Sequence, residues 1–160
     1  MFAKCSSPAG EPVCATLESK PTLRRRILVV EDELLVRRLN TRMLIYSGYD
    51  VDAAEDGAMA WSALQSTSYD LMVTDNEMPK VSGVELLQKV HATRLALPVI
   101  MATGKFPLDE FTRRPWLRPA VILLKPYTFD ELVGAVLTVL LAAAGAGGEI
   151  AAPTNGPARA

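Results

Sequence analysis

The sequence predicts an α/β domain in which a parallel sheet is covered by helices on both faces. Short continuous apolar runs, such as Ile27–Val30 and Val121–Leu124, are typical of strands that are buried on both sides. These runs alternate with segments whose apolar residues recur every three to four positions, as in amphipathic helices. Five strands that each precede a helix predict a doubly wound (βα)₅ sheet, because parallel strands are joined by helical crossovers.

The first helix is predicted over residues 33–47. Leu35, Leu39 and Met43 recur every four residues there, and Gly48 follows in the position that a helix C-cap prefers. The run Ile27–Val30 is therefore a first strand that is followed by an amphipathic helix.

The middle of the chain repeats this alternation. Residues 49–54 form the second strand, and Asp56 is suited to cap the helix after it. Leu71–Val73 is the third strand, a helix begins near Ser82, and Val99–Met101 is the fourth strand.

The segment between the fourth and fifth strands is the weak element. It contains Pro107, Pro115 and Pro119, so that Leu108–Arg114 has room for a helix of about two turns. The last helix begins near Phe129 and carries a broad apolar face. We expect the fourth helix to be short or distorted.

Composition limits the function classes. The 160 residues are 49% hydrophobic and carry a net charge of -1, so one globular core is expected and no nucleic-acid partner is indicated. The longest apolar stretch, 132–146, is too short to span a membrane, and no signal peptide is apparent. Cys5, Cys14 and a single histidine do not make a zinc site. We therefore expect a cytoplasmic protein.

Low-complexity ends border the predicted domain. Residues 1–23 read as a flexible arm and 144–160 as a disordered tail, because neither has hydrophobic periodicity. The folded unit is predicted to span residues 24–143.

Polar residues follow four of the five strands. Glu31 and Asp32 follow the first strand, Asp75 the third, Thr103 the fourth and Lys125 the fifth. In parallel α/β sheets the site lies at the carboxyl ends of the strands, so these side chains are expected to share one crevice. Carboxylates that repel one another favour a divalent cation, and Mg²⁺ prefers such hard oxygen ligands. Asp75 can then attack phosphorus as a nucleophile, with Lys125 and Thr103 as partners for the phosphoryl oxygens.

Four motifs in this order resemble the signatures of the response-regulator receiver domain, which has the CheY-like, flavodoxin-like fold. They are VVEDE, TDNEMPKVSG, MATG and LKPY, each at a predicted strand end, within residues 26–143. The resemblance implies strand order 2-1-3-4-5, Asp75 as the phosphoacceptor, and Glu31 and Asp32 as the acid pair around Mg²⁺. It also implies that the main-chain carbonyl of Glu77 is a further metal ligand, that Thr103 and Lys125 contact the phosphoryl group, and that the bond from Lys125 to Pro126 is cis.

Two features depart from the family pattern: the residue at position 122 and the proline-rich fourth helix. Ile122 lies where the family often has an aromatic residue on the fifth strand, so the usual threonine–aromatic relay is not expected. Glu77 and Lys105 form an opposite-charge pair at positions that flank the entry to the phosphoryl group. The proline-rich fourth segment predicts a remodelled partner-binding face.

Four other features are given structural interpretations. His91 is expected at the surface, Trp61 and Trp116 in the core, and Arg24–Arg26 at a solvated strand entry.

The resemblance favours a stand-alone receiver. It would take a phosphoryl group from a sensor histidine kinase or a histidine phosphotransfer protein and signal by protein–protein contact, through the face made by the fourth helix, fifth strand and last helix. Beyond this self-modification no enzymatic activity is expected.

Three alternatives stay open. A Mg²⁺-dependent phosphatase of the haloacid-dehalogenase type shares the order Asp75, Thr103, Lys125, but Glu77 stands where that family has a second aspartate. A receiver-like module that works unphosphorylated is the second alternative. A receiver cut from a larger hybrid kinase is the third.

Overall fold

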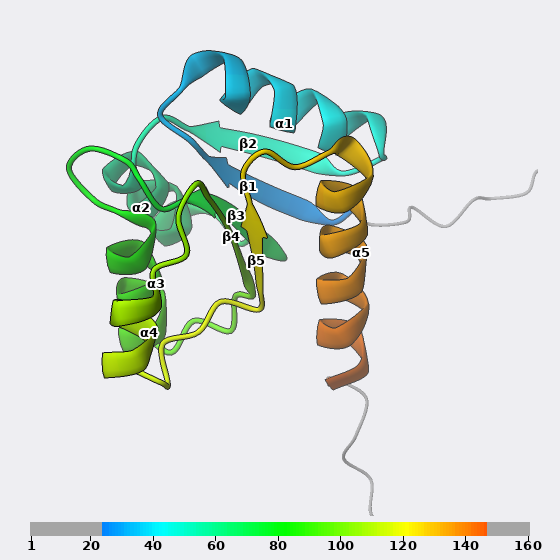
Figure 1. Ribbon diagram of the computed structural model, residues 1–160. Helices are drawn as coiled ribbons and strands as arrows, with labels where there is room; N and C mark the ends of the chain where they lie inside the picture. Colours follow the sequence, from blue (N-terminus) through cyan, green and yellow to red (C-terminus); the bar gives the residue numbers. More distant parts are fainter. Residues whose placement is uncertain (1–23, 147–160) are drawn as a thin grey trace, which may run out of the picture.

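Five parallel strands form one sheet in the order β2-β1-β3-β4-β5, as predicted, and a helix links each strand to the next (Figure 1). The computed structural model describes residues 24–146. The expected arm at 1–23 lies outside the described residues, as does the expected tail from 147 onward, whereas residues 144–146 of that tail belong to the last helix. The elements are β1 Arg26–Val30, α1 Leu34–Tyr46, β2 Asp50–Ala54, α2 Gly57–Ser66, β3 Leu71–Asp75, α3 Gly83–Ala92, β4 Val99–Thr103, α4 Leu108–Arg113, β5 Val121–Leu124 and α5 Phe129–Ala146.

Two apolar clusters lie on opposite faces of the sheet. Successive strand residues point to opposite faces, so that Leu28 and Val30 join the cluster under α2, α3 and α4. Ile27 and Val29 join the cluster that contains Leu132 of α5. The central strands are therefore buried on both sides, which explains their continuous apolar sequence.

Helix α1 forms where it was predicted, but the leucine stripe that predicted it is not its buried face. Leu35 is 72% exposed and Leu39 is 53% exposed. The buried residues of the helix are Asn40 and Leu44. Each comes one position after a member of the predicted stripe, Leu39 and Met43. Because Asn40 donates a hydrogen bond of 2.8 Å to the hydroxyl of Tyr127, a polar residue can occupy this core-facing position.

The predicted helix ends are confirmed by their hydrogen bonds. The Asp56 carboxylate accepts a bond of 2.8 Å from the N–H of Met59 at the start of α2. Gly48 follows α1 with φ of +93°, a conformation in which a side chain would be strained. Ser82 and Glu85 form a reciprocal capping box at the start of α3.

Helix α4 is short, as expected, with six residues and one buried side chain, that of Phe111. The prediction that Trp116 belongs to the core is wrong. Trp116 is 57% exposed and lies against His91, with ring centroids 4.8 Å apart. The coil after α4 places Trp116 at the surface, while Leu117, the next residue, is buried. Trp61 packs at the edge of the core, partly buried.

The arginines at the start of β1 pair with aspartates at the same end of the sheet. Arg25 contacts Asp70 at 2.7 Å, and Arg26 contacts Asp52 at 2.8 Å. Their charges are therefore neutralised locally. Within residues 24–146, no helix combines the length and the hydrophobicity needed to cross a membrane.

Candidate functional site

Three carboxylates meet where β1 and β3 end. Val30 pairs with Thr74 in the sheet, so Glu31 and Asp75 emerge side by side. Oxygens of Glu31, Asp32 and Asp75 all lie within 4.8 Å of one another. Glu31 and Asp75 are buried, whereas Asp32 is exposed. The expected convergence of these acids is thus confirmed, and one member is open to solvent.

Lys125 joins this cluster from the end of β5. Its Nζ lies 2.8 Å from an oxygen of Glu31 and 2.8 Å from an oxygen of Asp75. Burial alone would lower the pKa of Lys125, but the hydrogen bonds to Asp75 and Glu31 and their charges raise it above its ordinary value. Lys125 is therefore a fixed positive charge beside two buried carboxylates.

Glu31 experiences opposing influences. Burial raises the pKa of Glu31 above its ordinary value, the hydrogen bond from Lys125 acts against this, and the charge of Asp75 raises it further. The Lys125 ammonium therefore does not fully offset the effect of burial and of the Asp75 charge on the Glu31 carboxylate. A cation at the three oxygens would supply the remaining charge.

The donor set suits a hard divalent cation. Mg²⁺ binds through one or two protein carboxylates and keeps several waters, which requires close oxygen ligands with one side open. The cluster of Glu31, Asp32 and Asp75 has both properties. These three residues can therefore hold Mg²⁺.

Thr103 is fully buried at the end of β4, and its hydroxyl is engaged within its own loop. The hydroxyl donates to the carbonyl of Lys105 at 2.9 Å and accepts from the Lys105 N–H at 3.3 Å. The Thr103 carbonyl also accepts a bond of 2.9 Å from the N–H of Lys125. The β4 and β5 ends are thus tied together, while the Thr103 side chain faces Lys105.

The segment after Asp75 folds back tightly on the strand end. The Glu77 N–H donates to an Asp75 carboxylate oxygen at 3.2 Å, and its side chain is exposed. Gly83 packs on the Asp75 carbonyl so closely that a Cβ there would overlap it. The Asn76 carboxamide oxygen accepts from the N–H of Val84 at 3.1 Å. Glu77 is therefore held beside the acidic cluster.

Two basic residues at this edge were not predicted from the sequence. Arg37 of α1 donates to the carbonyls of Glu31 and Asp32. Lys80 lies 2.6 Å from the buried carboxylate of Asp56. Neither contact has a sequence signal, since each depends on how a turn is folded.

Comparison with known proteins gives one consistent family. The family model "Response regulator receiver domain" matches residues 27–137. It describes a receiver domain and not a family of catalytic enzymes, which argues against the phosphatase alternative.

Curated relatives place similar segments within longer proteins. The chain is 31% identical to the response regulator MprA of Mycobacterium avium over 72% of this chain and 50% of the relative. It is 36% identical to the sensor protein EvgS of Escherichia coli O157:H7 over 66% of this chain and 9% of the relative. The chain therefore spans about half the length of the former and about a tenth of the latter.

Solved structures share the fold. A CheY-like receiver domain from Methanospirillum hungatei JF-1 superposes with a TM-score of 0.73 at 24% identity, over 78% of this chain and 99% of that one. The response regulator TrrA of Thermotoga maritima, solved with Mg(2+)-BeF, has a TM-score of 0.63 at 32% identity, over 72% of this chain and 98% of that one. By sequence match, fold and acidic cluster, the chain belongs to the response regulator receiver domain family.

Proposed function

We propose that Asp75 accepts a phosphoryl group from a phosphohistidine donor in the presence of Mg²⁺, and that the domain then signals by protein–protein contact. The observation that carries this proposal is the position of Asp75. Its buried carboxylate lies within 4.8 Å of oxygens of Glu31 and Asp32 and 2.8 Å from the Lys125 ammonium. This arrangement can place a phosphoryl group between a cation site and a fixed positive charge.

The reaction is a displacement at phosphorus. An Asp75 oxygen forms the new P–O bond while the P–N bond to the donor histidine breaks, and the released imidazole nitrogen takes a proton. Bound Mg²⁺ would neutralise charge on the phosphoryl oxygens. Glu31, Asp32, Asp75 and the Glu77 carbonyl would hold it. That the similar protein TrrA was solved in complex with Mg(2+)-BeF supports this part of the proposal.

Lys125 and Thr103 have separate parts in this proposal. Lys125 already touches Asp75 and would bind a phosphoryl oxygen by charge. Thr103 must release the Lys105 carbonyl before its hydroxyl can donate to the phosphoryl group. Phosphorylation would therefore change the hydrogen bonds of the loop between β4 and α4.

The phosphodonor is a protein in this proposal, because receiver domains partner with histidine kinases. A sensor histidine kinase or a histidine phosphotransfer protein would dock on the surface beside the site, and two features support this. Leu35 and Leu39 of α1 are largely exposed, and a pocket of about 410 Å³ lies between α1 and Tyr127. An exposed apolar helix face next to a reactive carboxylate favours a helical protein donor.

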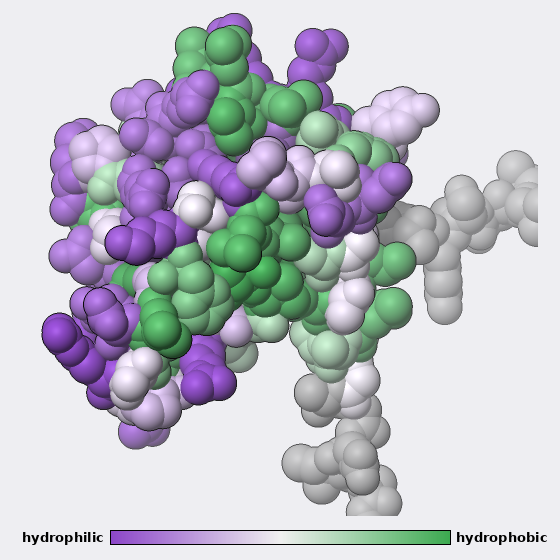
Figure 2. All heavy atoms as spheres, in the orientation of Figure 1, coloured by the Kyte–Doolittle hydropathy of each residue, from purple (hydrophilic) through white to green (hydrophobic). Residues whose placement is uncertain are grey.

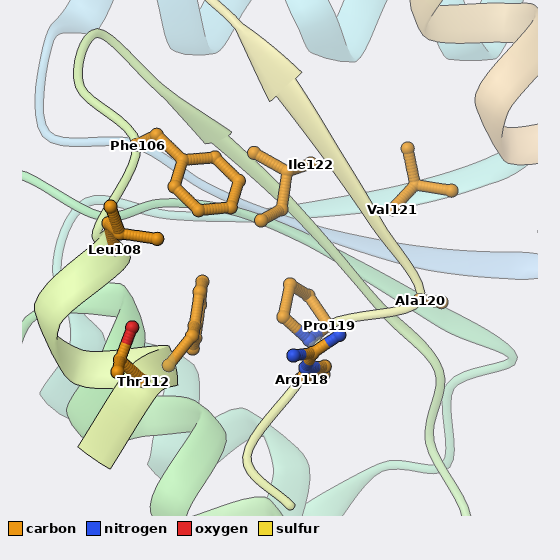
Figure 3. A pocket seen from close by; sticks show the side chains of 9 residues that line it. Phe106, Leu108, Thr112, Arg118, Pro119, Ala120, Val121 and Ile122 are labelled. Carbon is orange, nitrogen blue, oxygen red and sulfur yellow. The ribbon is translucent and has the colours of Figure 1, made fainter. Parts of the chain in front are cut away.

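The downstream partner would contact the α4-β5-α5 face. Figure 2 shows hydrophobic residues gathered over β5 in the middle of this view. A pocket of about 360 Å³ separates α4 from β5, and Figure 3 shows Phe106 pointing toward Ile122 across it. Leu124 of β5 is 55% exposed. Because α4 is short, this face has a hollow that a partner side chain can fill.

A cytoplasmic location follows from the proposal, since phosphohistidine donors obtain their phosphoryl groups from ATP. The ion pairs of Arg25 and Arg26 with aspartates support the absence of a nucleic-acid role. That the receiver works as a stand-alone protein stays a prediction.

The decisive experiment is phosphorylation by a small donor, acetyl phosphate, with Mg²⁺. We expect intact-mass spectrometry to show one added phosphoryl group that is removed by hydroxylamine, and no addition to Asp75→Asn. An unmodified wild-type protein, or equal modification of the variant, would reject the proposal. Repeated hydrolysis of a small phosphoester, instead of stoichiometric labelling, would support a phosphatase.

A second experiment addresses the biological donor. Phosphotransfer from a panel of autophosphorylated histidine kinases is expected to label wild type and not Asp75→Asn. If Asp75→Ala binds its downstream partner at full strength and independently of donor, the module works unphosphorylated.

A further inference from the structure

The turn that carries two of the three acids has no cap of its own. Glu31 and Asp32 follow β1, and Glu33 occupies the N-cap position of α1 without a side-chain hydrogen bond to the helix. In many helices the side chain at the N-cap position accepts a hydrogen bond from a free N–H of the first turn, and α1 lacks this bond. The Glu31 N–H donates to the Ala54 carbonyl of β2 at 3.1 Å, so the sheet holds one end of this turn, while no side-chain cap holds the other.

Arg37, one turn further along α1, adds side-chain contacts to the main chain of this turn. Its Nη1 donates to the carbonyl of Glu31 at 2.7 Å and to the carbonyl of Asp32 at 3.1 Å. Its Nη2 lies 3.9 Å from a carboxylate oxygen of Glu55, which follows β2. The Arg37 side chain is 14% exposed. One guanidinium thus links both residues of the acid pair to the neighbouring strand end.

We infer that Arg37 is a positioning residue that sets the carboxylates of Glu31 and Asp32 for cation binding. This inference rests on the proposed function. Hydrogen bonds from a charged donor to carbonyls are strong and directional. The planar guanidinium uses Nη1 for the carbonyls of Glu31 and Asp32, and its Nη2 faces the Glu55 carboxylate. Groups that orient ligands in this manner change metal affinity when they are removed.

The charge of Arg37 and its hydrogen bonds predict opposite effects on Mg²⁺ affinity. As a positive charge near the cluster, Arg37 repels a cation, so that its removal would tighten Mg²⁺ binding. As an anchor for the turn, it keeps the ligands in place, so that its removal would weaken binding. The direction of the change therefore separates a positioning role from an electrostatic one.

Isothermal titration calorimetry with Mg²⁺ on the full chain provides the test. We expect Arg37→Met to raise the Mg²⁺ dissociation constant about tenfold. Arg37→Lys keeps the charge but cannot span all three acceptors, and is expected to lie between Arg37→Met and wild type. Arg38→Met is the matched control, because it removes the same charge from an exposed neighbour on α1.

Amide hydrogen exchange at residues 31–34 gives a readout that does not depend on the metal. Faster exchange at this turn in Arg37→Met, with no change in Arg38→Met, is expected if Arg37 fixes it. If Arg37→Met does not fold, Mg²⁺ titration and amide exchange of Arg37→Lys test the positioning role instead.

The outcomes separate this inference from the proposed function. Mg²⁺ binding by Arg37→Met that equals or exceeds that of wild type would overturn the inference. If Mg²⁺ binding depends on Arg37 but Asp75 is never phosphorylated, the proposed function fails and the positioning role is upheld.

Discussion

Lys125 Nζ lies 2.8 Å from an Asp75 carboxylate oxygen, and the two residues approach from strands that are separated by β4. The same ammonium contacts Glu31 at 2.8 Å. Three strand ends are thus held together by one side chain that is 27% exposed. The contacts that suit the site to phosphoryl chemistry therefore also bear on the stability of the domain without metal.

Lys125→Met tests this stabilising role. Loss of the ammonium leaves two buried carboxylates side by side, so we expect the free energy of unfolding to fall by about 3 kcal/mol at neutral pH. Urea denaturation without metal measures the change. Arg38→Met, at an exposed position on α1, is expected to change stability by less than about 0.5 kcal/mol. Equal stability of the two variants would contradict a structural role for Lys125.

The pair of Asp56 and Lys80 predicts a pH dependence. The hydrogen bond from Lys80, together with that from the Met59 N–H, lowers the pKa of Asp56 below its ordinary value of 3.8. A carboxyl with a lower pKa in the folded state stabilises the fold above pH 3.8, and this contribution is lost as pH falls through the lowered value.

We expect Lys80→Met to raise the pKa of Asp56, as followed by NMR titration of its carboxyl carbon. Asp56→Asn keeps an acceptor for Met59 and should remove the acid-dependent part of stability without loss of the cap. An unchanged titration of Asp56 in Lys80→Met would show that the ion pair is not formed in solution.

The exposed leucines of α1 predict a selective defect in phosphotransfer. Leu39→Lys is expected to slow transfer from a histidine kinase at least about tenfold, a loss typical of truncating a central interface residue. Its reaction with acetyl phosphate should be unchanged, because Asp75 is not touched. Ile45→Lys, on the same helix and 52% exposed, is the control. Equal rates for both variants with the kinase would exclude this face as the docking site.

Replacing two glycines by alanine is expected to change the stability of the fold in opposite directions. A Cβ at Gly83 would overlap the Asp75 carbonyl, so Gly83→Ala is expected to destabilise the fold by about 2 kcal/mol and to disturb the site. A Cβ at Gly134 meets nothing within 4 Å, and Gly134→Ala in the interior of α5 should stabilise by about 1 kcal/mol. Thermal unfolding of the two variants checks both. A Gly83→Ala protein as stable as wild type would show that the turn can relax.

The sequence was sufficient to predict those features that depend on local pattern. Continuous apolar runs located four of the five strands; β2, with the sequence DVDAA, is the exception. Polar residues after β1, β3, β4 and β5 located the candidate site, since parallel strands present their carboxyl ends at one edge. Pro107, Pro115 and Pro119 predicted the short α4 because proline excludes regular helix on steric grounds.

Features that depend on tertiary neighbours were not predictable. The leucine stripe of α1 indicated a helix correctly, but which face is buried depends on the sheet and on the bond from Asn40 to Tyr127. Trp116 lies at the surface because of the path of a coil segment. Arg37 bonds to main-chain carbonyls, which have no residue identity and leave no trace in a sequence.

Strand order also has a consequence for how the protein is made. β1 lies between β2 and β3, and its second partner ends 45 residues later at Asp75. During synthesis β1 therefore keeps one unpaired edge until β3 has left the ribosome, and such an edge invites incorrect pairing. The strand that ends in Asp75, the proposed phosphoacceptor, is also the strand that completes the centre of the sheet. Substitutions within Leu71–Thr74 are thus expected to act on the yield of folded protein, whatever they do to signalling.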